Sequence, residues 1–148
     1  MINSLIYNIS IPIILAIIMN GIIFFFKLNK EQKKNPYLPE GYIIGIVWVI
    51  LLALLGYIHY LLYDKNKMIT ITSLSLISLI LLCILYPIIT SLKVKNGLLL
   101  NLITLILSFV VGLMIISESK YIFIFMIPLL LWVSYVNIIF TIECSNII

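Results

Sequence analysis

The stretch NPYLPEGYIIGIVWVILLALLGYIHYLLY, residues 35–63, decides the fold of this chain. From Tyr42 to Tyr63 it contains no Lys, Arg, Asp or Glu. About 20 apolar residues are enough for a helix to cross the ~30 Å hydrocarbon layer of a bilayer, at ~1.5 Å per residue. A lone strand in lipid would leave its backbone polar groups unpaired, so a segment of this kind must be helical. Residues 42–63 are therefore predicted to form a transmembrane helix.

Similar apolar stretches recur on both sides of this segment. The chain has 148 residues, of which 64% are apolar and 9% are charged, and its mean hydropathy is +1.30. No soluble domain of this size could solvate such a surface, so lipid must be the solvent. Charged residues gather in the short breaks between the stretches, as expected for spans. The sequence predicts an all-α membrane protein, a single five-helix transmembrane domain over 1–148, with helices at about 5–26, 42–63, 68–91, 97–116 and 121–142.

The lysines predict how the chain is oriented. The connections 27–41 and 92–96 carry six Lys, whereas 64–67 and 117–120 carry three. By the positive-inside rule, the C-terminus then faces the cytoplasm and the N-terminus lies outside. The first stretch lacks the basic leading region and the small-residue cleavage site of a signal peptide, so we expect it to be retained as a span.

Several functional classes find no support in the residues. The nine Lys are scattered and are not interleaved with exposed aromatic residues, which argues against nucleic-acid binding. Cys83 and Cys144 form no CxxC motif and no Cys/His cluster, so neither a metal site nor a disulfide framework is indicated. The spans hold no paired carboxylates, Ser/His/Asp set or phosphate-binding loop, so no catalytic residue is assigned. Membrane lipid is the expected partner, and no cofactor is required.

Polar residues inside the spans are the candidates for function, because hydrocarbon makes them costly. His59 lies on roughly the same helical face as Trp48 and Leu52. Two interpretations of His59 stay open: an axial haem ligand or proton-linked group, and a neutral imidazole bonded to a neighbouring helix. Gly41 and Gly45, four residues apart, favour close packing of this helix on a neighbour.

Three short motifs occur in order along the chain. YLPEGY (37–42) is followed by GIVW (45–48), Pro87 is followed by Asn101, and IPLLLWVSY spans 127–135. Within five predicted spans, this order resembles the translocator protein family (TSPO, also called tryptophan-rich sensory protein or peripheral benzodiazepine receptor). The family shows Trp-x-Pro-Pro-x-Trp and Gly-x-x-Trp at the second helix and Tyr-Pro-Tyr-x-x-Trp-x-x-Phe in the fifth. Asn101 stands where members carry an Asp.

The resemblance implies a five-helix bundle, commonly a homodimer, with a pocket between the helices that the first loop covers. Family members bind porphyrins such as protoporphyrin IX and haem, and several bind sterols. The implied membrane is the mitochondrial outer membrane or another host membrane. Lys30, Lys33 and Lys34 at the mouth would meet the propionates of a porphyrin. The implied ligand-binding residues are Tyr37, Pro39, Tyr42, Trp48, Leu52, Tyr57, His59, Asn101, Pro128, Trp132 and Tyr135.

The chain departs from the family pattern in ways that bear on activity. It has two Trp, fewer than other members, which counts against the light-driven porphyrin degradation attributed to pocket Trp. No basic residue follows Lys120, so the sterol motif expected near the C-terminus is incomplete. We therefore expect a receptor or carrier for porphyrin, haem or a similar flat apolar ligand. The alternatives are a tetrapyrrole-degrading enzyme and a membrane interaction or scaffold protein with a vestigial pocket.

Overall fold

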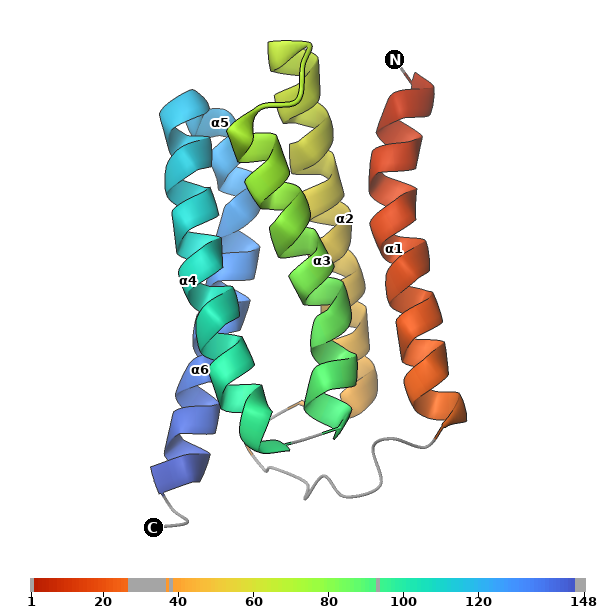
Figure 1. The fold of residues 1–148 in the computed structure, drawn as a ribbon, viewed down its shortest axis with the longest axis vertical. Helices are drawn as coiled ribbons and strands as arrows, with labels where there is room; N and C mark the ends of the chain where they lie inside the picture. Colours follow the sequence, from red (N-terminus) through yellow and green to blue (C-terminus); the bar gives the residue numbers. More distant parts are fainter. Residues whose placement is uncertain (1, 27–36, 38, 93, 146–148) are drawn as a thin grey trace.

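The computed structural model describes residues 2–26, 37, 39–92 and 94–145. Within them no strand occurs, and the last span is built from a short helix, a 3-10 turn and a long helix that follow one path (Figure 1). The described residues thus form the five-helix all-α membrane bundle predicted from the sequence. The elements are α1 (Ile2–Phe25), α2 (Gly41–Asn66), α3 (Ile71–Leu92), α4 (Val94–Glu118), α5 (Lys120–Phe123), η1 (Ile124–Met126) and α6 (Ile127–Ser145).

These helices have the length and the surface of membrane spans. α3 has 22 residues and contains a shorter apolar helix, Ile71–Pro87. Large apolar side chains such as Ile17, Leu113 and Leu131 point outward, which is stable only against lipid. The chain is therefore an integral, multi-pass membrane protein. Four further segments are long and apolar enough to cross a membrane: Asn3–Phe25, Gly41–Asn66, Leu99–Glu118 and Lys120–Ile139.

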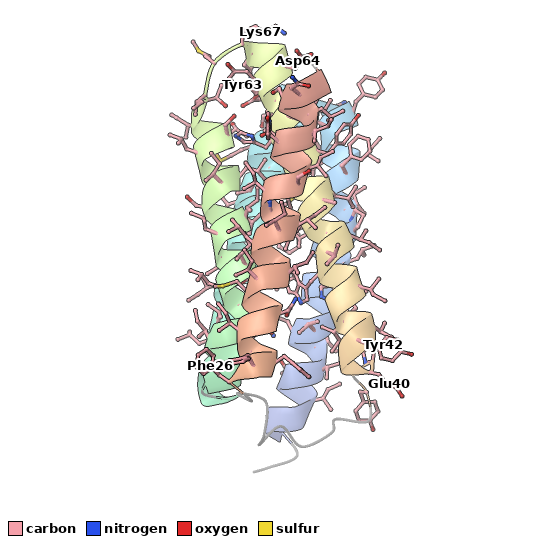
Figure 2. All side chains as sticks on the ribbon, turned by 90° about the vertical axis from the view of Figure 1, so that its right-hand side faces the viewer. Phe26, Glu40, Tyr42, Tyr63, Asp64 and Lys67 are labelled. Atoms are coloured by element: carbon pink, nitrogen blue, oxygen red, sulfur yellow. The ribbon has the colours of Figure 1, made fainter. Side chains whose placement is uncertain are left out.

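Aromatic and charged residues mark the two ends of the bundle, as they do at membrane interfaces. We call the end where α1 stops and α2 starts the first-loop end. α1 begins at the opposite end and α6 finishes at the first-loop end (Figure 1), as an odd number of crossings requires. Figure 2 shows Phe26, Glu40 and Tyr42 at the first-loop end and Tyr63, Asp64 and Lys67 at the other.

The helices pack in a ring that leaves α1 at the periphery. α1 packs against α2 and α3, and α3 packs against α4. α4 in turn packs against α5 and α6, while α2 closes the ring through η1 and α5. α1 therefore lies along the seam between α2 and α3 (Figure 1). The core contains Leu52, Leu76, Val111 and Met126, each fully or almost fully buried.

Local signals explain the tight turn between α2 and α3. Lys67 adopts a left-handed conformation with φ of 54°, and its N–H donates to the carbonyl of Tyr63 at 2.8 Å. This single residue stops α2. The hydroxyl of Thr70 then accepts from the N–H of Ser73 at 3.2 Å and satisfies one of the free donors at the start of α3.

The last span changes helix type just before Pro128. η1 ends at Met126, and α6 begins at Ile127. Pro128 has no N–H for the carbonyl of Ile124, and its ring crowds that carbonyl. The chain therefore tightens into a 3-10 turn there.

Close packing of α2 on a neighbour occurs at Gly56. A Cβ built on Gly56 would overlap the carbonyl oxygen of Asn8 and lie 3.1 Å from the Cα of Ile9. This is a contact of backbone on backbone between α2 and α1. At Gly41 and Gly45, by contrast, no described atom lies within 4 Å of a built Cβ. No helix of the described part of the chain therefore packs closely against Gly41 and Gly45, contrary to the prediction.

Candidate ligand-binding site

A chain of aromatic and polar side chains crosses the bundle toward the first-loop end. Trp48 of α2 is buried, and its ring centroid lies 5.5 Å from that of Tyr86 in α3. The side chain of Tyr86 lies close to that of Asn101 in α4. Asn137 of α6 donates from Nδ2 to the backbone carbonyl of Asn101 at 3.2 Å. These contacts connect four helices in a region where the sequence predicted ligand contacts.

α6 adds a second aromatic pair and a tie to the segment before α2. The ring centroids of Trp132 and Tyr135 are 5.8 Å apart. The hydroxyl of Tyr135 donates to the backbone carbonyl of Tyr37 at 2.7 Å, although these residues are far apart in the sequence. This bond fixes the end of the first connection against α6.

Two hydrogen-bond donors in this region are buried without a partner among the described residues. They are Nδ2 of Asn101 and Nε1 of Trp132. A buried donor left in this way costs ~1–3 kcal/mol, and an oxygen atom of a ligand would recover that energy. We call the whole set the loop-end site; it comprises Tyr37, Trp48, Tyr86, Asn101, Trp132 and Tyr135.

The other residues predicted from the resemblance lie away from the loop-end site or on its margin. Leu52 is fully buried in the core, and Tyr57 meets Phe125 edge to face at 5.1 Å. Tyr42 and Pro128 are exposed, and Pro39 is half-buried. Lys30, Lys33 and Lys34 lie outside the described residues.

His59 lies in a separate cavity of about 260 Å³ between α1, α2 and α3. Its Nδ1 atom is 2.5 Å from Oδ1 of Asn8 in α1. This is an interhelical bond of the kind that one interpretation of His59 predicted. We call this cavity the α1–α3 groove; its walls include Asn8, Ile11, Leu15, His59, Leu81 and Ile84.

Sequence reasoning missed Tyr86 and Asn8. Both are polar residues inside apolar stretches, and that signal alone could have singled them out. Their partners could not be found in the same way, because Asn8 is 51 residues from His59. Such a pairing depends on how the helices pack.

Comparisons with known proteins agree with the motif resemblance. The model of the TspO/MBR family matches residues 9–141, a range that reaches from α1 into α6. A comparison with curated proteins gave no significant match. A comparison with solved structures gave none either.

Proposed function

The chain belongs to the TspO/MBR family, and on that premise we propose that it binds a porphyrin, haem or a similar flat apolar ligand at the loop-end site. It would act there as a membrane receptor or carrier. This proposal combines the ligand class that the motif resemblance implies with the side chains that gather at one end of the bundle.

The observation that carries the proposal is the pair of buried donors without a partner among the described residues. Nδ2 of Asn101 and Nε1 of Trp132 are both N–H groups, and they suit carboxylate or carbonyl oxygens. The rings of Trp48 and Tyr86 offer apolar faces on which a flat ring system can stack. An apolar environment with a few convergent polar groups is typical of small-molecule sites.

The packing of the helices indicates where such a ligand would enter. α2 packs against η1 and α5, which lie toward the opposite end of the bundle, and makes no comparable contact with α6 within the described residues. The two helices are thus less closely joined toward the first-loop end. The bond from Tyr135 to the carbonyl of Tyr37 lies at that end. We infer that the ligand enters between α2 and α6 beside Tyr37, and that sterols would use the same site.

A titration with protoporphyrin IX tests the proposal, because the chain has two Trp residues. In Trp48→Phe the fluorescence reports only on Trp132, and in Trp132→Phe only on Trp48. We expect saturable quenching in the purified protein in nanodiscs. Each Phe variant should bind more weakly, because Phe offers a smaller ring face than Trp and, at position 132, has no N–H to donate to the ligand.

Phe109→Leu is the control, because Phe109 is an exposed aromatic residue on α4 and its loss should not change affinity. Unchanged affinity in both Trp variants would remove the loop-end site from the proposal. Absence of saturable quenching in the unmodified protein would favour an interaction or scaffold role. Loss of porphyrin absorbance under illumination would instead favour the enzyme.

The homodimer implied by the resemblance also remains a proposal. Ser108 is fully buried, and a Cβ built on Gly112 would lie 3.3 Å from the ring of Phe123 in the same chain. That part of α4 is therefore used inside the bundle. The Gly41 and Gly45 face of α2 is open within the described residues and is the better surface for a second copy.

A further inference from the structure

His59, one of the residues that line the α1–α3 groove, has a buried hydrogen-bond acceptor with no partner among the described residues. Nδ2 of Asn8 donates to the carbonyl of Ser4 at 2.8 Å, which turns Oδ1 of Asn8 toward His59. Because an amide oxygen only accepts, Nδ1 of His59, 2.5 Å away, must carry the hydrogen. In the neutral ring Nε2 then holds a lone pair. That atom is buried and has no partner among the described residues.

The rest of the groove is apolar and opens sideways. Ile11, Leu15 and Leu81 are among its walls, and all three are exposed in the bundle. The opening therefore lies between α1 and α3, on the side that Figure 2 faces. None of the described Lys, Asp or Glu residues lines the groove. An occupant would enter from the lipid and would carry no charge.

The polar and apolar parts of the groove are ordered along the bilayer normal. His59 is seven residues before Asn66, where α2 ends, so it lies ~10 Å below that end at ~1.5 Å per residue. α1 runs in the opposite direction, and Leu15 follows Asn8 by seven residues toward the bilayer centre. The groove is thus polar near the membrane surface and apolar deeper, which is how a membrane amphiphile lies.

We propose that the α1–α3 groove binds a neutral amphiphile with one hydroxyl group and an apolar chain, and that the hydroxyl donates to Nε2 of His59. The volume of about 260 Å³ lies below the ~300–1,000 Å³ of sites for drug-sized ligands. It therefore suits a single chain better than a tetrapyrrole. This site is separate from the loop-end site and does not depend on porphyrin binding there.

Photolabelling in phosphatidylcholine vesicles tests the proposal. The probe is a long-chain alcohol with a diazirine in its chain and a terminal alkyne, and the matched probe is its methyl ether, which cannot donate a hydrogen bond. Mass spectrometry locates the labelled peptides. We expect the alcohol to label α1 and α3 around Leu15 and Ile84 about fivefold more than the ether, the value of one hydrogen bond. Excess unlabelled alcohol should compete.

Two variants separate the acceptor from the shape of the groove. His59→Phe removes the acceptor, so the preference for the alcohol over the ether should disappear. Leu81→Trp fills the groove from its rim without touching His59, so labelling by both probes should fall. Leu113→Trp is the matched control, because Leu113 is an exposed residue of α4 outside the groove, and it should leave labelling unchanged.

Equal labelling of the unmodified protein by alcohol and ether would overturn the proposal, because the groove would then hold only annular lipid chains. Labelling that Leu81→Trp leaves unchanged would overturn it as well. So would crosslinks from the groove to a second copy of the chain in place of the probe. The probe comparison and the Leu81→Trp result decide the matter even if His59→Phe does not fold.

Discussion

Asn8 and His59 form a polar link between α1 and α2 in a region where apolar contacts dominate. The distance between Nδ1 of His59 and Oδ1 of Asn8 is 2.5 Å, and the side chain of Asn8 is also fixed by its bond to Ser4. Hydrogen bonds between helices in membranes are weaker than their surroundings suggest, since the unfolded protein also finds partners in lipid. We therefore expect this bond to make only a small contribution to the free energy of unfolding.

We predict a coupling energy of ~0.6 kcal/mol, and at most ~1.7 kcal/mol, between Asn8→Leu and His59→Leu. The measurement is a double-mutant cycle of unfolding in mixed micelles. Additive effects of the two substitutions would show that the bond contributes nothing. In that case the apolar contacts of α1 alone hold the helix.

At Gly56 the backbones of α1 and α2 are in direct contact. A methyl group there would overlap the carbonyl oxygen and carbon of Asn8. These are backbone atoms, so a change of side-chain rotamer cannot relieve the overlap. We predict that Gly56→Ala lowers the free energy of unfolding by ~1–3 kcal/mol, the usual cost of overpacking. Thermal unfolding in detergent, followed by circular dichroism, measures the change.

Gly45→Ala is the matched control on the same helix. A built Cβ at Gly45 meets no described atom within 4 Å, and Ala is ~0.5–1 kcal/mol better than Gly inside a helix. We expect Gly45→Ala to keep or raise stability. If both variants lose stability equally, the loss comes from the glycines as such and not from the contact with α1.

At the scale of residues, the sequence predicted single members of the loop-end site but not their partners. The motifs pointed to Trp48 and Trp132, whose residue type the family pattern carries, and to Asn101, which stands where members carry an Asp. The contact of Trp48 with Tyr86 depends on the rotation of α2 and α3 about their axes. Apolar spans leave that rotation undetermined, because lipid and protein interiors are equally apolar.

At the scale of elements, the bond from Tyr135 to Tyr37 joins α6 to the start of α2. Tyr135→Phe removes only the hydroxyl that donates to the carbonyl of Tyr37. We predict faster hydrogen exchange in peptides that contain Tyr37 to Gly41, because this segment loses its tie to α6. Hydrogen exchange with mass spectrometry in nanodiscs gives the measurement.

Tyr42→Phe serves as the comparison for Tyr135→Phe. Tyr42 is exposed on the first turn of α2, and its hydroxyl should have no effect on exchange. If Tyr135→Phe changes exchange no more than Tyr42→Phe, the bond does not hold the segment.

The elements themselves could be predicted well from length and polarity. The second span was expected at 42–63 and forms α2, Gly41–Asn66. α2 runs three residues further at its C-terminus than expected, because polar residues can continue a helix beyond the hydrocarbon. Two of these residues bond to the end of α4: Lys65 donates to the backbone carbonyl of Glu118, and Asn66 donates to the side-chain carboxylate of Glu118 at 2.8 Å. The 3-10 turn before Pro128 was not predicted, since hydropathy carries no information on hydrogen-bond type.

At the scale of the whole molecule, the orientation inferred from the lysines is open to direct measurement. Asn3→Cys in a chain with Cys83→Ala and Cys144→Ser should react with an impermeant maleimide outside intact cells. Cys144 in the Cys83→Ala chain should react only after permeabilisation. These expectations follow from the excess of Lys on the side of the connections 27–41 and 92–96.

The two possible failures of this labelling differ in meaning. Labelling of both positions from one face would contradict an odd number of crossings and the five-helix fold with it. Labelling with the two faces exchanged would contradict only the positive-inside assignment. The family and the bundle would then stand, with the opposite orientation.

The order of the helices around the bundle was not predictable from the sequence. Short connections place α2 beside α3 and α3 beside α4, but they do not say that α1 lies along the seam between α2 and α3. For the same reason, the α1–α3 groove could not be anticipated. The groove forms because α1 packs closely on α2 at Gly56, whereas the side of α1 that faces the groove is open to lipid.

The peripheral position of α1 has a consequence for biogenesis. α1 precedes α2 and α3 in the chain, yet its packing surface is supplied mainly by these two helices. During synthesis α1 can pack first on α2, whose Gly56 contacts its backbone, and it can pack on α3 only after that helix has been inserted. The first helix to be translated therefore completes its packing only after the third, and until then the face of α1 that meets α3 is covered by lipid.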